Sequence, residues 1–477
     1  MTDTPTSPVS PSIATTPRPL VVDLDGTLCK TDTLWECFFA AWRVQWWLPL
    51  ACAFWMLSGR SKLKDRLAAI AVPEATALPW NLAVIDVLRA ARVAGRRTVL
   101  ATAANVRIAQ SCADELDLFD EVLASDGVVN LKGHAKAAEL VARFGQGGFD
   151  YLGDSTADLP VWAAADRKLT VSDVVPAGGE RLAQAEASLA VSHWVKLLRV
   201  RHWVKNVLVF VAPIAAHQWS AGATWLSALL TFAAFCAVCS GVYVLNDLFD
   251  LASDRAHPTK RRRPLAAGEL SLATATFVAL VLLIGGLGLA FWIGPLVGAV
   301  VALYVVANAI YTVRLKRVAV FDVFCLAGLY TLRIVAGAAA VMVPLSTWLV
   351  AFSVFAFLSL ALLTRAADID RLAPDEVLPG RGYSGRDAAF VNGFGISSAI
   401  AACLVLALYV ASEQVAAMYA EPLWLWGVAV VVLMWLARMW RMAMNGTMDD
   451  DPVMFAVRDG VSIGCALAVV LFGALAL

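Results

Sequence analysis

Charged side chains are scarce in this sequence. Only 16% of its 477 residues are Asp, Glu, Lys or Arg, whereas 60% are hydrophobic. A mean hydropathy of +0.70 is too high for an ordinary soluble protein. Lys plus Arg and Asp plus Glu each number 38, so the formal net charge is zero, which argues against a nucleic-acid-binding protein. The composition therefore predicts a chain that lies at least partly in a membrane.

Cysteine patterns typical of metal sites are also lacking. The nine Cys are scattered, and the C-x-x-C pair Cys236 and Cys239 lies in an apolar run with no second pair and no His partner. We expect both to be packing residues, and the odd count fits a reducing compartment. No basic segment followed by an apolar one is found at the N-terminus, so no secretory signal is expected. Residues 1–17, rich in Thr, Ser and Pro, predict a disordered leader.

Strand-like apolar runs alternate with amphipathic helical patterns in the first part of the chain. The run 19–22 ends in DLDGTL, and similar runs end within RTVLATAAN at 97–105 and FDYLGDSTAD at 149–158. Alternating strands and helices predict a doubly wound α/β domain, which we place at 18–190. Ligands of such sheets bind at the carboxyl ends of the strands, where these three motifs fall.

The order of these motifs resembles that of the haloacid dehalogenase-like phosphatases. The matching residues are Asp23 and Asp25, Thr102, Lys132 in NLKG, and Asp154 with Asp158. The resemblance implies that Asp23 is the nucleophile that takes the phosphoryl group and that Asp25 is the acid/base. It also implies that Thr102 and Lys132 bind the phosphoryl oxygens, and that Asp154 completes a Mg²⁺ site with Asp23. A non-catalytic copy kept as a scaffold is the alternative.

An unusually aromatic segment, residues 34–57, falls where this phosphatase family carries a cap, here about 30–80. Its purely apolar part, 46–57, contains Pro49 and is shorter than the roughly 20 residues that a membrane span needs. We expect a helical cap that leans on the membrane surface. A cap whose apolar residues form a buried core is the alternative.

The remainder of the chain, 197–477, predicts an all-α membrane domain. Its apolar runs suggest about nine transmembrane helices, near 203–217, 223–245, 272–292, 295–313, 323–342, 346–363, 390–411, 422–440 and 459–477. Lys and Arg collect in alternate connections, which places those connections and the phosphatase domain in the cytoplasm. A multi-pass protein of a bacterial-type inner (plasma) membrane is expected.

Polar residues interrupt the apolar runs in the segment 246–264. Asn246, Asp247, Asp250 and Asp254 share one face of a helix, and Lys260, Arg261, Arg262 and Arg263 follow them. Clustered carboxylates of this kind suit Mg²⁺ held together with substrate phosphates. A charged loop that only orients the protein in the membrane is the alternative. Arg333, about 16 Å along a helix from Asp322, lies near mid-bilayer and is expected to face an anionic ligand.

This half of the chain resembles the UbiA superfamily of intramembrane prenyltransferases. The resemblance is carried by N-D-x-x-D-x-x-x-D at 246–254 and by HPTKRRRPLAAG after it. Within the superfamily the chain is most similar to the decaprenyl-phosphate phosphoribosyltransferases, although Thr364-Arg365 stands where a Lys-Arg pair is expected. The resemblance implies Mg²⁺ bound by Asn246, Asp247, Asp250 and Asp254. It implies substrate binding by a set of basic and aromatic residues: Lys205, Lys260, Arg262, Arg263, Tyr311, Lys316 and Arg333.

The function expected from both resemblances is transfer of 5-phosphoribose from phosphoribosyl pyrophosphate to a polyprenyl phosphate, followed by removal of the 5-phosphate by the fused phosphatase domain. One alternative is transfer of a prenyl chain from its diphosphate to an aromatic acceptor. Another, from a different class, is a membrane transporter with a regulatory domain, although no internal repeat is evident. The expected partners are these substrates and membrane lipid, and the oligomeric state is left open.

Overall fold

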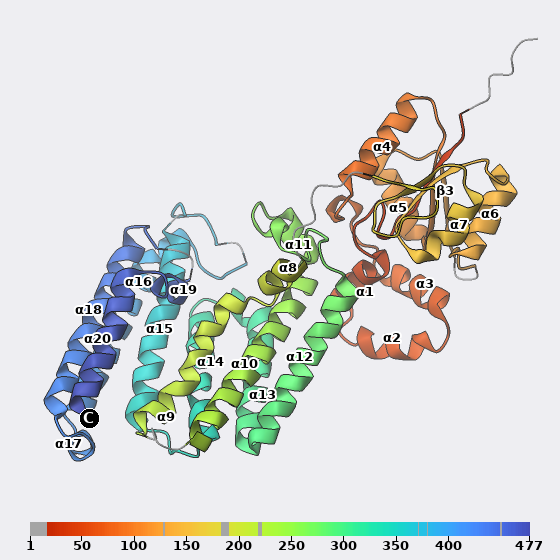
Figure 1. The fold of residues 1–477 in the computed structure, drawn as a ribbon. Coiled ribbons are helices and arrows are strands. Elements are labelled where there is room, and N and C mark those ends of the chain that lie inside the picture. Colours follow the sequence, from red (N-terminus) through yellow and green to blue (C-terminus); the bar gives the residue numbers. More distant parts are fainter. Residues whose placement is uncertain are drawn as a thin grey trace, which may run out of the picture. The chain divides into compact units, whose positions relative to one another are not determined.

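The structure, a computed structural model, describes residues 17–126, 129–182, 190–217, 222–370, 372–378, 380–448 and 451–477. The chain divides into two compact units. The first unit is Met1–Leu197 with Val244–Phe277, and the second is Leu198–Tyr243 with Val278–Leu477. Figure 1 shows the elements of each unit. The predicted leader, 1–17, lies outside the described residues except for its last position.

A six-stranded parallel sheet forms the centre of the first unit, in the order β3-β2-β1-β4-β5-β6. Strand β1 lies between β2 and β4, with Leu20 opposite Thr98 on one side and Asp150 on the other. The strands are β1 (Leu20–Val22), β2 (Thr98–Asn105), β3 (Glu121–Ser125), β4 (Asp150–Gly153), β5 (Lys168–Thr170) and β6 (Glu180–Arg181). The three strands predicted from apolar runs are β1, β2 and β4, so the predicted α/β domain is confirmed.

Helices cover both faces of this sheet because successive side chains of a strand point to opposite faces. Leu20 and Val22 face the core formed with α4 (Leu82–Val93) and α5 (Val106–Leu116). Val21 between them faces the core formed with α6 (His134–Phe144) and α7 (Leu159–Ala164). Because these helices cover the two faces of the sheet, they do not cover the edge at which β1, β2 and β4 end. The motif loops lie at that edge.

Three helices follow β1 and form the predicted cap: α1 (Thr33–Val44), α2 (Leu48–Met56) and α3 (Arg60–Ile70). Asp32 caps α1 by accepting from the Leu34 backbone N–H, and Pro49 stands in the first turn of α2, where its missing N–H costs no helical bond. Cys37, Leu48 and Leu67 are buried in a core shared with the α4–α5 face of the sheet.

The segment 244–277 belongs to the first unit although it follows the start of the membrane half. It contains the end of α10 (Gly222–Phe249), the short helices α11 (Leu251–Ala256) and η4 (Lys260–Arg262), and the start of α12 (Leu272–Ile293). Phe249 stacks edge-on against Trp42 of the cap, with ring centroids 4.6 Å apart. Gly268, at φ +71°, lies so close to Lys30 that a Cβ there would meet the Lys30 Cβ at 2.9 Å. These contacts explain why the segment and the cap are one body.

The second unit consists of long apolar helices. Among the described residues, seven helices of the chain are long and apolar enough to cross a membrane. They are α10, α12, α13 (Pro295–Val313), α14 (Phe321–Ala340), α15 (Thr347–Ile369), Gly385–Val410 comprising η6 and α16, and Pro422–Met444 comprising η7 and α18. The final apolar helix, α20 (Gly460–Ala476), has 17 residues and is shorter than these.

Seven of the nine predicted spans thus coincide with described helices long enough to cross a membrane, and the last predicted span corresponds to the shorter α20. The run 203–217 folds as a 3₁₀ segment, η3 (Val200–Phe210), and the five-residue helix α9 (Val211–Ala215). Its polar side chains have partners inside the unit: Lys205 binds Asp451, and Asn206 accepts from Arg333. Such a short, polar-lined segment packs against its neighbours and does not cross a bilayer by itself.

Candidate functional site

The motif loops at the edge of the sheet bring three carboxylates together. Asp23 follows β1 directly, and Asp154 and Asp158 follow β4. Oxygens of Asp23, Asp154 and Asp158 all lie within 4.8 Å of one another. Gly26 makes this approach possible, because a Cβ at this φ +77° residue would meet the Asp154 Oδ2 at 2.2 Å. The Asp-x-Asp-Gly motif thus requires Gly at its fourth position.

Lys136, which the sequence analysis missed, is the cation of this cluster. Its Nζ donates to Asp23 Oδ1 at 2.9 Å and to the Tyr151 hydroxyl at 2.9 Å, and it lies 3.5 Å from Asp158 Oδ1. The side chain of Lys136 is only 3% exposed. Burial, which alone would lower its pKa, is outweighed by the charges of Asp23 and Asp158, so the pKa of Lys136 is raised. Lys136 is therefore a charged, fixed partner of the predicted nucleophile.

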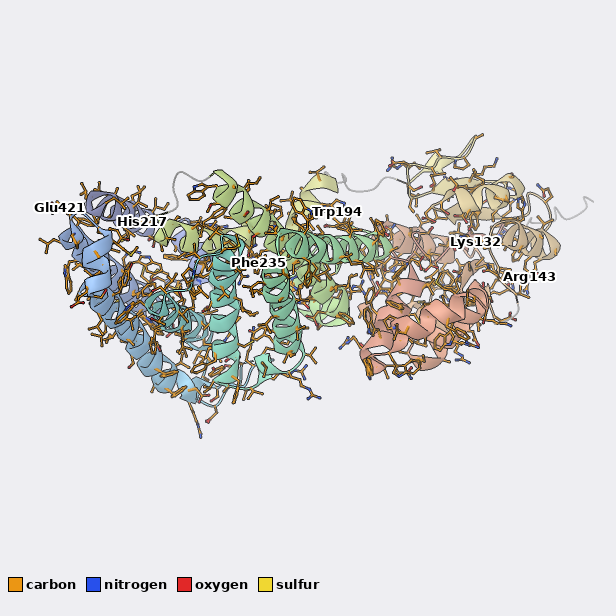
Figure 2. All side chains as sticks on the ribbon, turned by 90° about the horizontal axis from the view of Figure 1, so that it is seen from below. Lys132, Arg143, Trp194, His217, Phe235 and Glu421 are labelled. Carbon is orange, nitrogen blue, oxygen red and sulfur yellow. The ribbon has the colours of Figure 1, made fainter. Side chains whose placement is uncertain are left out.

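The phosphoryl-binding role of Lys132 stays a prediction, and the structure places Lys132 and Lys136 differently. Lys132 lies exposed in the loop before α6, as Figure 2 shows, whereas Lys136 stands in the first turn of that helix. The helix turns Lys136, Ala137 and Leu140 to the same buried side. A lysine on the apolar face of an amphipathic helix was the signal that could have identified Lys136 from the sequence.

Asp158 holds the cluster in place. Its Oδ1 accepts from the Tyr151 hydroxyl at 2.6 Å, and its Oδ2 accepts from the backbone N–H groups of Asp154 and Ser155 at 3.3 and 3.2 Å. Both oxygens of Asp158 accept hydrogen bonds from Tyr151 and from the loop backbone. The carboxylates of Asp23 and Asp154 are therefore better placed than that of Asp158 to bind a ligand. Burial, followed by the charge of Asp23, raises the pKa of Asp154 to about 7.

These carboxylates fit the expected Mg²⁺. Three hard oxygen donors lie within reach of one cation, and their mutual repulsion is relieved most directly by a divalent ion. Asp23 and Asp154 are the residues that would hold it. Thr102, fully buried within β2, accepts from the Ala104 N–H at 3.0 Å, and its phosphoryl-binding role stays a prediction.

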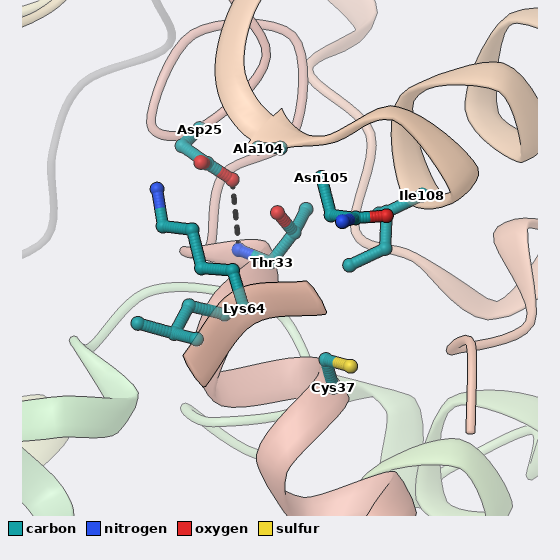
Figure 3. A pocket seen from close by; sticks show the side chains of 8 residues that line it. Asp25, Thr33, Cys37, Lys64, Ala104, Asn105 and Ile108 are labelled. Carbon is teal, nitrogen blue, oxygen red and sulfur yellow. Dashed lines mark hydrogen bonds between the residues drawn. The ribbon is translucent and has the colours of Figure 1, made fainter. Parts of the chain in front are cut away.

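Asp25 lies at a small pocket between the cap and the sheet (Figure 3). Its Oδ1 accepts from the Thr33 N–H at the start of α1, 2.8 Å away. Burial, reinforced by the charge of Asp32, raises the pKa of Asp25 to about 7, as an acid/base at neutral pH requires. Lys64 of α3 also lines this pocket, and its Nζ donates to the Ala103 carbonyl at 2.6 Å. Lys64 was missed because its position depends on how the cap folds over the sheet.

The Asp-rich segment contains its own ion-paired cluster. Arg263 Nη1 donates to Asp247 Oδ1 at 3.1 Å and to Asp254 Oδ2 at 2.7 Å, and both carboxylates are nearly fully buried. Asp250 is half-buried at the N-terminus of α11, and its N–H donates to the Asn246 carbonyl at 2.9 Å. Within the described part of the chain, these Asp residues do not gather as closely as Asp23, Asp154 and Asp158 do. Mg²⁺ binding by this segment stays a prediction.

Lys260 and Arg262 of η4 are exposed beside this cluster, so two of the predicted phosphate ligands face solvent.

Arg255, in contrast, does not face solvent. It donates from Nη2 and Nη1 to the two oxygens of Glu36 on α1, at 2.6 and 3.1 Å, and Thr31 donates to the same carboxylate at 2.7 Å. Both charged side chains are buried. This fork links the cap to the residue that follows Asp254.

Residues predicted as ligands in the second unit have protein partners there. Arg333 is 5% exposed and donates to Asn206 Oδ1, to the Leu329 carbonyl and to the Tyr304 hydroxyl, at 2.8, 2.6 and 3.0 Å. Its acceptors are neutral groups of η3, α13 and its own helix, so the expected anionic ligand stays a prediction.

Two other predicted ligands lie near polar groups of this unit. Lys205 binds Asp451, and the Tyr311 hydroxyl accepts from Arg381. Lys316 lies in η5 (Leu315–Arg317). The substrate roles of all three stay predictions.

Asp322, in the first turn of α14, is fully buried. It accepts from Arg365 Nε at 2.9 Å and from the Tyr383 hydroxyl at 2.7 Å. Arg365, which follows the departing residue Thr364, thus joins α15 to α14. The RGYS sequence at 381–384 contributes Tyr383 to the same buried group, so part of that motif is structural.

Comparison with known proteins agrees with both halves of this description. The model of the haloacid dehalogenase-like hydrolases matches residues 20–162, and that of the UbiA prenyltransferase family matches residues 207–458. An uncharacterised protein, y4nM, from Sinorhizobium fredii is 38% identical over 94% of this chain and 90% of its own length.

Two further relatives carry more specific names. A decaprenyl-phosphate phosphoribosyltransferase from Mycolicibacterium smegmatis is 35% identical over 38% of this chain and 58% of its own. A UbiA homologue from Archaeoglobus fulgidus, solved with GPP and Mg²⁺, is 16% identical, with a TM-score of 0.45 over 59% of this chain and 98% of its own. The chain belongs to the UbiA prenyltransferase family, as a multi-pass membrane protein with a haloacid dehalogenase-like hydrolase domain at its N-terminal side.

Proposed function

We propose that the membrane half transfers 5-phosphoribose from phosphoribosyl pyrophosphate to a polyprenyl phosphate. The observation that carries this proposal is the Asp-rich segment, in which Asp247 and Asp254 are buried around Arg263 beside the exposed Lys260 and Arg262. The similarity to the decaprenyl-phosphate phosphoribosyltransferases supports phosphoribose, in preference to a prenyl chain, as the transferred group.

In this reaction a phosphate oxygen of the lipid attacks C1 of the ribose, and diphosphate leaves from the same carbon. Negative charge grows on the leaving oxygens, so cations beside them lower the barrier. Lys260 and Arg262 are free to bind the outer phosphate groups. Asp247, Asp250 and Asp254 would hold Mg²⁺, which would supply positive charge for the diphosphate. Arg263, now paired with Asp247 and Asp254, is placed to bind the diphosphate as well.

The hydrolase domain then removes the 5-phosphate of the product. The Asp23 carboxylate attacks phosphorus, and the departing ribose oxygen takes a proton from Asp25. Water, deprotonated by Asp25, next attacks the aspartyl-phosphate and releases inorganic phosphate. Lys136 stays on Asp23 and neutralises charge on the phosphoryl oxygens. Fusion raises the local concentration of the second substrate at the second site.

Purified protein supplied with ribose-labelled phosphoribosyl pyrophosphate and polyprenyl phosphate should yield a lipid-linked ribose without a 5-phosphate. An Asp23→Asn variant should accumulate the phosphorylated lipid, and an Asp250→Asn variant should form neither lipid. If Asp23→Asn gives the same final product as the unaltered protein, the dephosphorylation step is wrong while the transfer step stands.

Release of diphosphate in the same assay separates the remaining alternatives. Phosphoribosyl pyrophosphate with polyprenyl phosphate is compared with a prenyl diphosphate plus an aromatic acceptor. Acceptor-dependent release from the prenyl diphosphate alone would contradict phosphoribosyl transfer and would favour prenyl transfer. Release from neither donor would contradict the transferase proposal as a whole and favour a transporter.

A further inference from the structure

Helix α2 of the cap carries two apolar faces, of which only one is used inside the protein. Leu48 and Cys52 face the cap core and are 0% and 8% exposed. On the other side, Trp46, Leu50, Phe54 and Leu57 are 82%, 77%, 69% and 84% exposed. Leu50 and Phe54, four residues apart, lie on one face of α2, and Trp46 and Leu57 lie just beyond its two ends. We call these four residues the cap stripe.

A row of large apolar side chains in water is unfavourable, because each one loses the free energy that burial of its apolar surface would give. A cap that only covered the phosphatase pocket would need one apolar face. A nine-residue helix such as α2 is about 14 Å long and cannot span a bilayer. Such a helix can lie in the interface, with its apolar face in the acyl region and its ends among the headgroups.

The cap also contacts the last residue of α10, which belongs to the same unit as the cap. Phe39 and Trp42 of α1 contact Phe249, with ring centroids 5.8 and 4.6 Å away. Phe249 is the last residue of α10, one of the candidate spans. Trp46, the first residue of the cap stripe, lies just beyond the end of α1, and its carbonyl accepts from the Trp42 indole N–H at 3.1 Å. The stripe therefore continues from a contact that already lies at the end of a membrane helix.

Charge around the stripe is of one sign. From 37 to 64 the sequence has four Lys or Arg and no Asp or Glu. Arg43 and Lys62, on either side of α2, are both exposed. Basic residues near a bilayer surface are attracted by anionic headgroups. An apolar row with basic flanks fits an anionic lipid surface better than it fits a protein partner.

From these observations we propose that the cap stripe docks on the lipid surface of the membrane that holds the chain's own helices. This inference goes beyond the proposed reactions and does not depend on which phosphate ester the hydrolase cleaves. Docking would affect how a lipid-borne phosphate reaches the Asp25 pocket. Helix α1 begins at the Asp25 pocket, where Leu34 and Cys37 line it, and runs towards the stripe. Docking would thus hold this pocket near the headgroups, where a lipid-borne phosphate lies.

The test uses the full chain reconstituted in vesicles of phosphatidylethanolamine and phosphatidylglycerol. A Phe54→Cys variant is labelled with an environment-sensitive fluorophore, and nitroxide-bearing lipid is added as a quencher. A Val93→Cys variant, on the 91% exposed residue at the end of α4, is the matched control. The native Cys are buried, except for half-buried Cys325, which is replaced by Ser in both variants.

Docking predicts a blue-shifted emission and a roughly twofold loss of intensity with nitroxide lipid for the label at position 54, and neither change at position 93. An aqueous quencher that reaches both labels equally would overturn the proposal. So would protection of position 54 from both quenchers together with energy transfer between labelled copies, because that result indicates contact with a second chain.

A second pair of variants tests the face itself. Leu50→Ser with Phe54→Ser, probed by a label at Leu57→Cys, should lose most of the lipid quenching seen with Leu57→Cys alone. These residues are exposed, so hydrolysis of a soluble aryl phosphate should be unchanged and serves as the control for folding. Equal lipid quenching in both backgrounds would show that the stripe is not the docking face.

Discussion

At the scale of single residues, the hydrolase site depends on a lysine that neutralises a buried nucleophile. Lys136 and Asp23 face each other with little solvent access, and burial raises the pKa of Asp23 against the opposing effect of Lys136. Removing the cation would leave a carboxylate that prefers to be protonated. A protonated Asp23 is a poor nucleophile, so loss of Lys136 weakens both the chemistry and the fold.

Substitution of Lys136 by Met is expected to reduce kcat for a soluble aryl phosphate by about 10²–10³-fold, because a cation at the reacting phosphoryl group is lost. Lys132→Met, the matched control four residues away, should change kcat by less than about twofold since Lys132 is exposed. Steady-state kinetics of the detergent-purified chain gives both values. A larger loss of kcat in Lys132→Met than in Lys136→Met would contradict this prediction and would assign phosphoryl binding to Lys132.

Asp25 should impose an alkaline limit on hydrolysis. With its pKa at about 7, the carboxyl is protonated below pH 7 and can donate to the leaving oxygen, but it is ionised above that pH. The value of kcat/KM for an alkyl phosphate should therefore fall about tenfold per pH unit above 7. An aryl phosphate, whose leaving group needs no proton, should show a much weaker fall. Equal profiles for the two esters would contradict this role of Asp25.

At the scale of elements, α1 of the cap and α11 of the Asp-rich segment are joined by a buried, forked ion pair. Glu36 accepts from Arg255 and from Thr31, and Arg255 also donates from Nε to the Ala266 carbonyl at 3.0 Å. Both oxygens of Glu36 and all three nitrogens of the Arg255 guanidinium thus take part in hydrogen bonds. A buried pair of this kind specifies which surfaces meet, because either charge alone is costly.

Arg255→Met is expected to destabilise the first unit by about 3–5 kcal/mol, since Glu36 would stay buried without its counter-ion. Combining it with Glu36→Leu should recover most of that loss. The exposed pair Arg18 and Asp166 provides the control: Arg18→Ala should cost less than about 1 kcal/mol. Denaturant midpoints of the purified chain measure all three. Additive losses in the double variant would show that the two residues are not energetically coupled.

At the scale of the whole molecule, the chain contains two acidic clusters with different cations. Asp23, Asp154 and Asp158 surround Lys136 at the edge of the sheet, whereas Asp247 and Asp254 surround Arg263 in the Asp-rich segment. The two clusters lie in one compact unit, yet no residue belongs to both. Their chemistries should therefore be separable by mutation.

Asp154→Asn is expected to abolish aryl phosphate hydrolysis while diphosphate release by the transferase continues at near its normal rate. Asp254→Asn should have the reverse effect, because it removes a carboxylate that only the second cluster uses. Each rate is measured on the same purified protein with Mg²⁺ present, and chelation of Mg²⁺ should stop both reactions. Loss of both activities in each variant would indicate one shared site.

Local sequence patterns predicted much of the architecture. Apolar runs located β1, β2, β4 and seven long helices, because strand and span lengths follow from hydrophobic periodicity alone. They failed for 203–217, where apolar residues surround Lys205 and Asn206, whose partners Asp451 and Arg333 are far away in the sequence. Composition cannot distinguish a short packed segment from a span when tertiary partners satisfy its polar groups.

The sequence by itself determined the two families, the parallel sheet and the positions of Asp23, Asp25 and Asp154 after its strands. Only the tertiary structure decided which basic side chains form ion pairs with the buried carboxylates. Lys136 lies 113 residues from Asp23, and Arg255 lies 219 residues from Glu36. A motif fixes the residues within one turn of chain, but pairings over such separations depend on how strands and helices are brought together. Lys132 and Lys136 differ by one helical turn, and the fold alone determines which of them reaches the nucleophile.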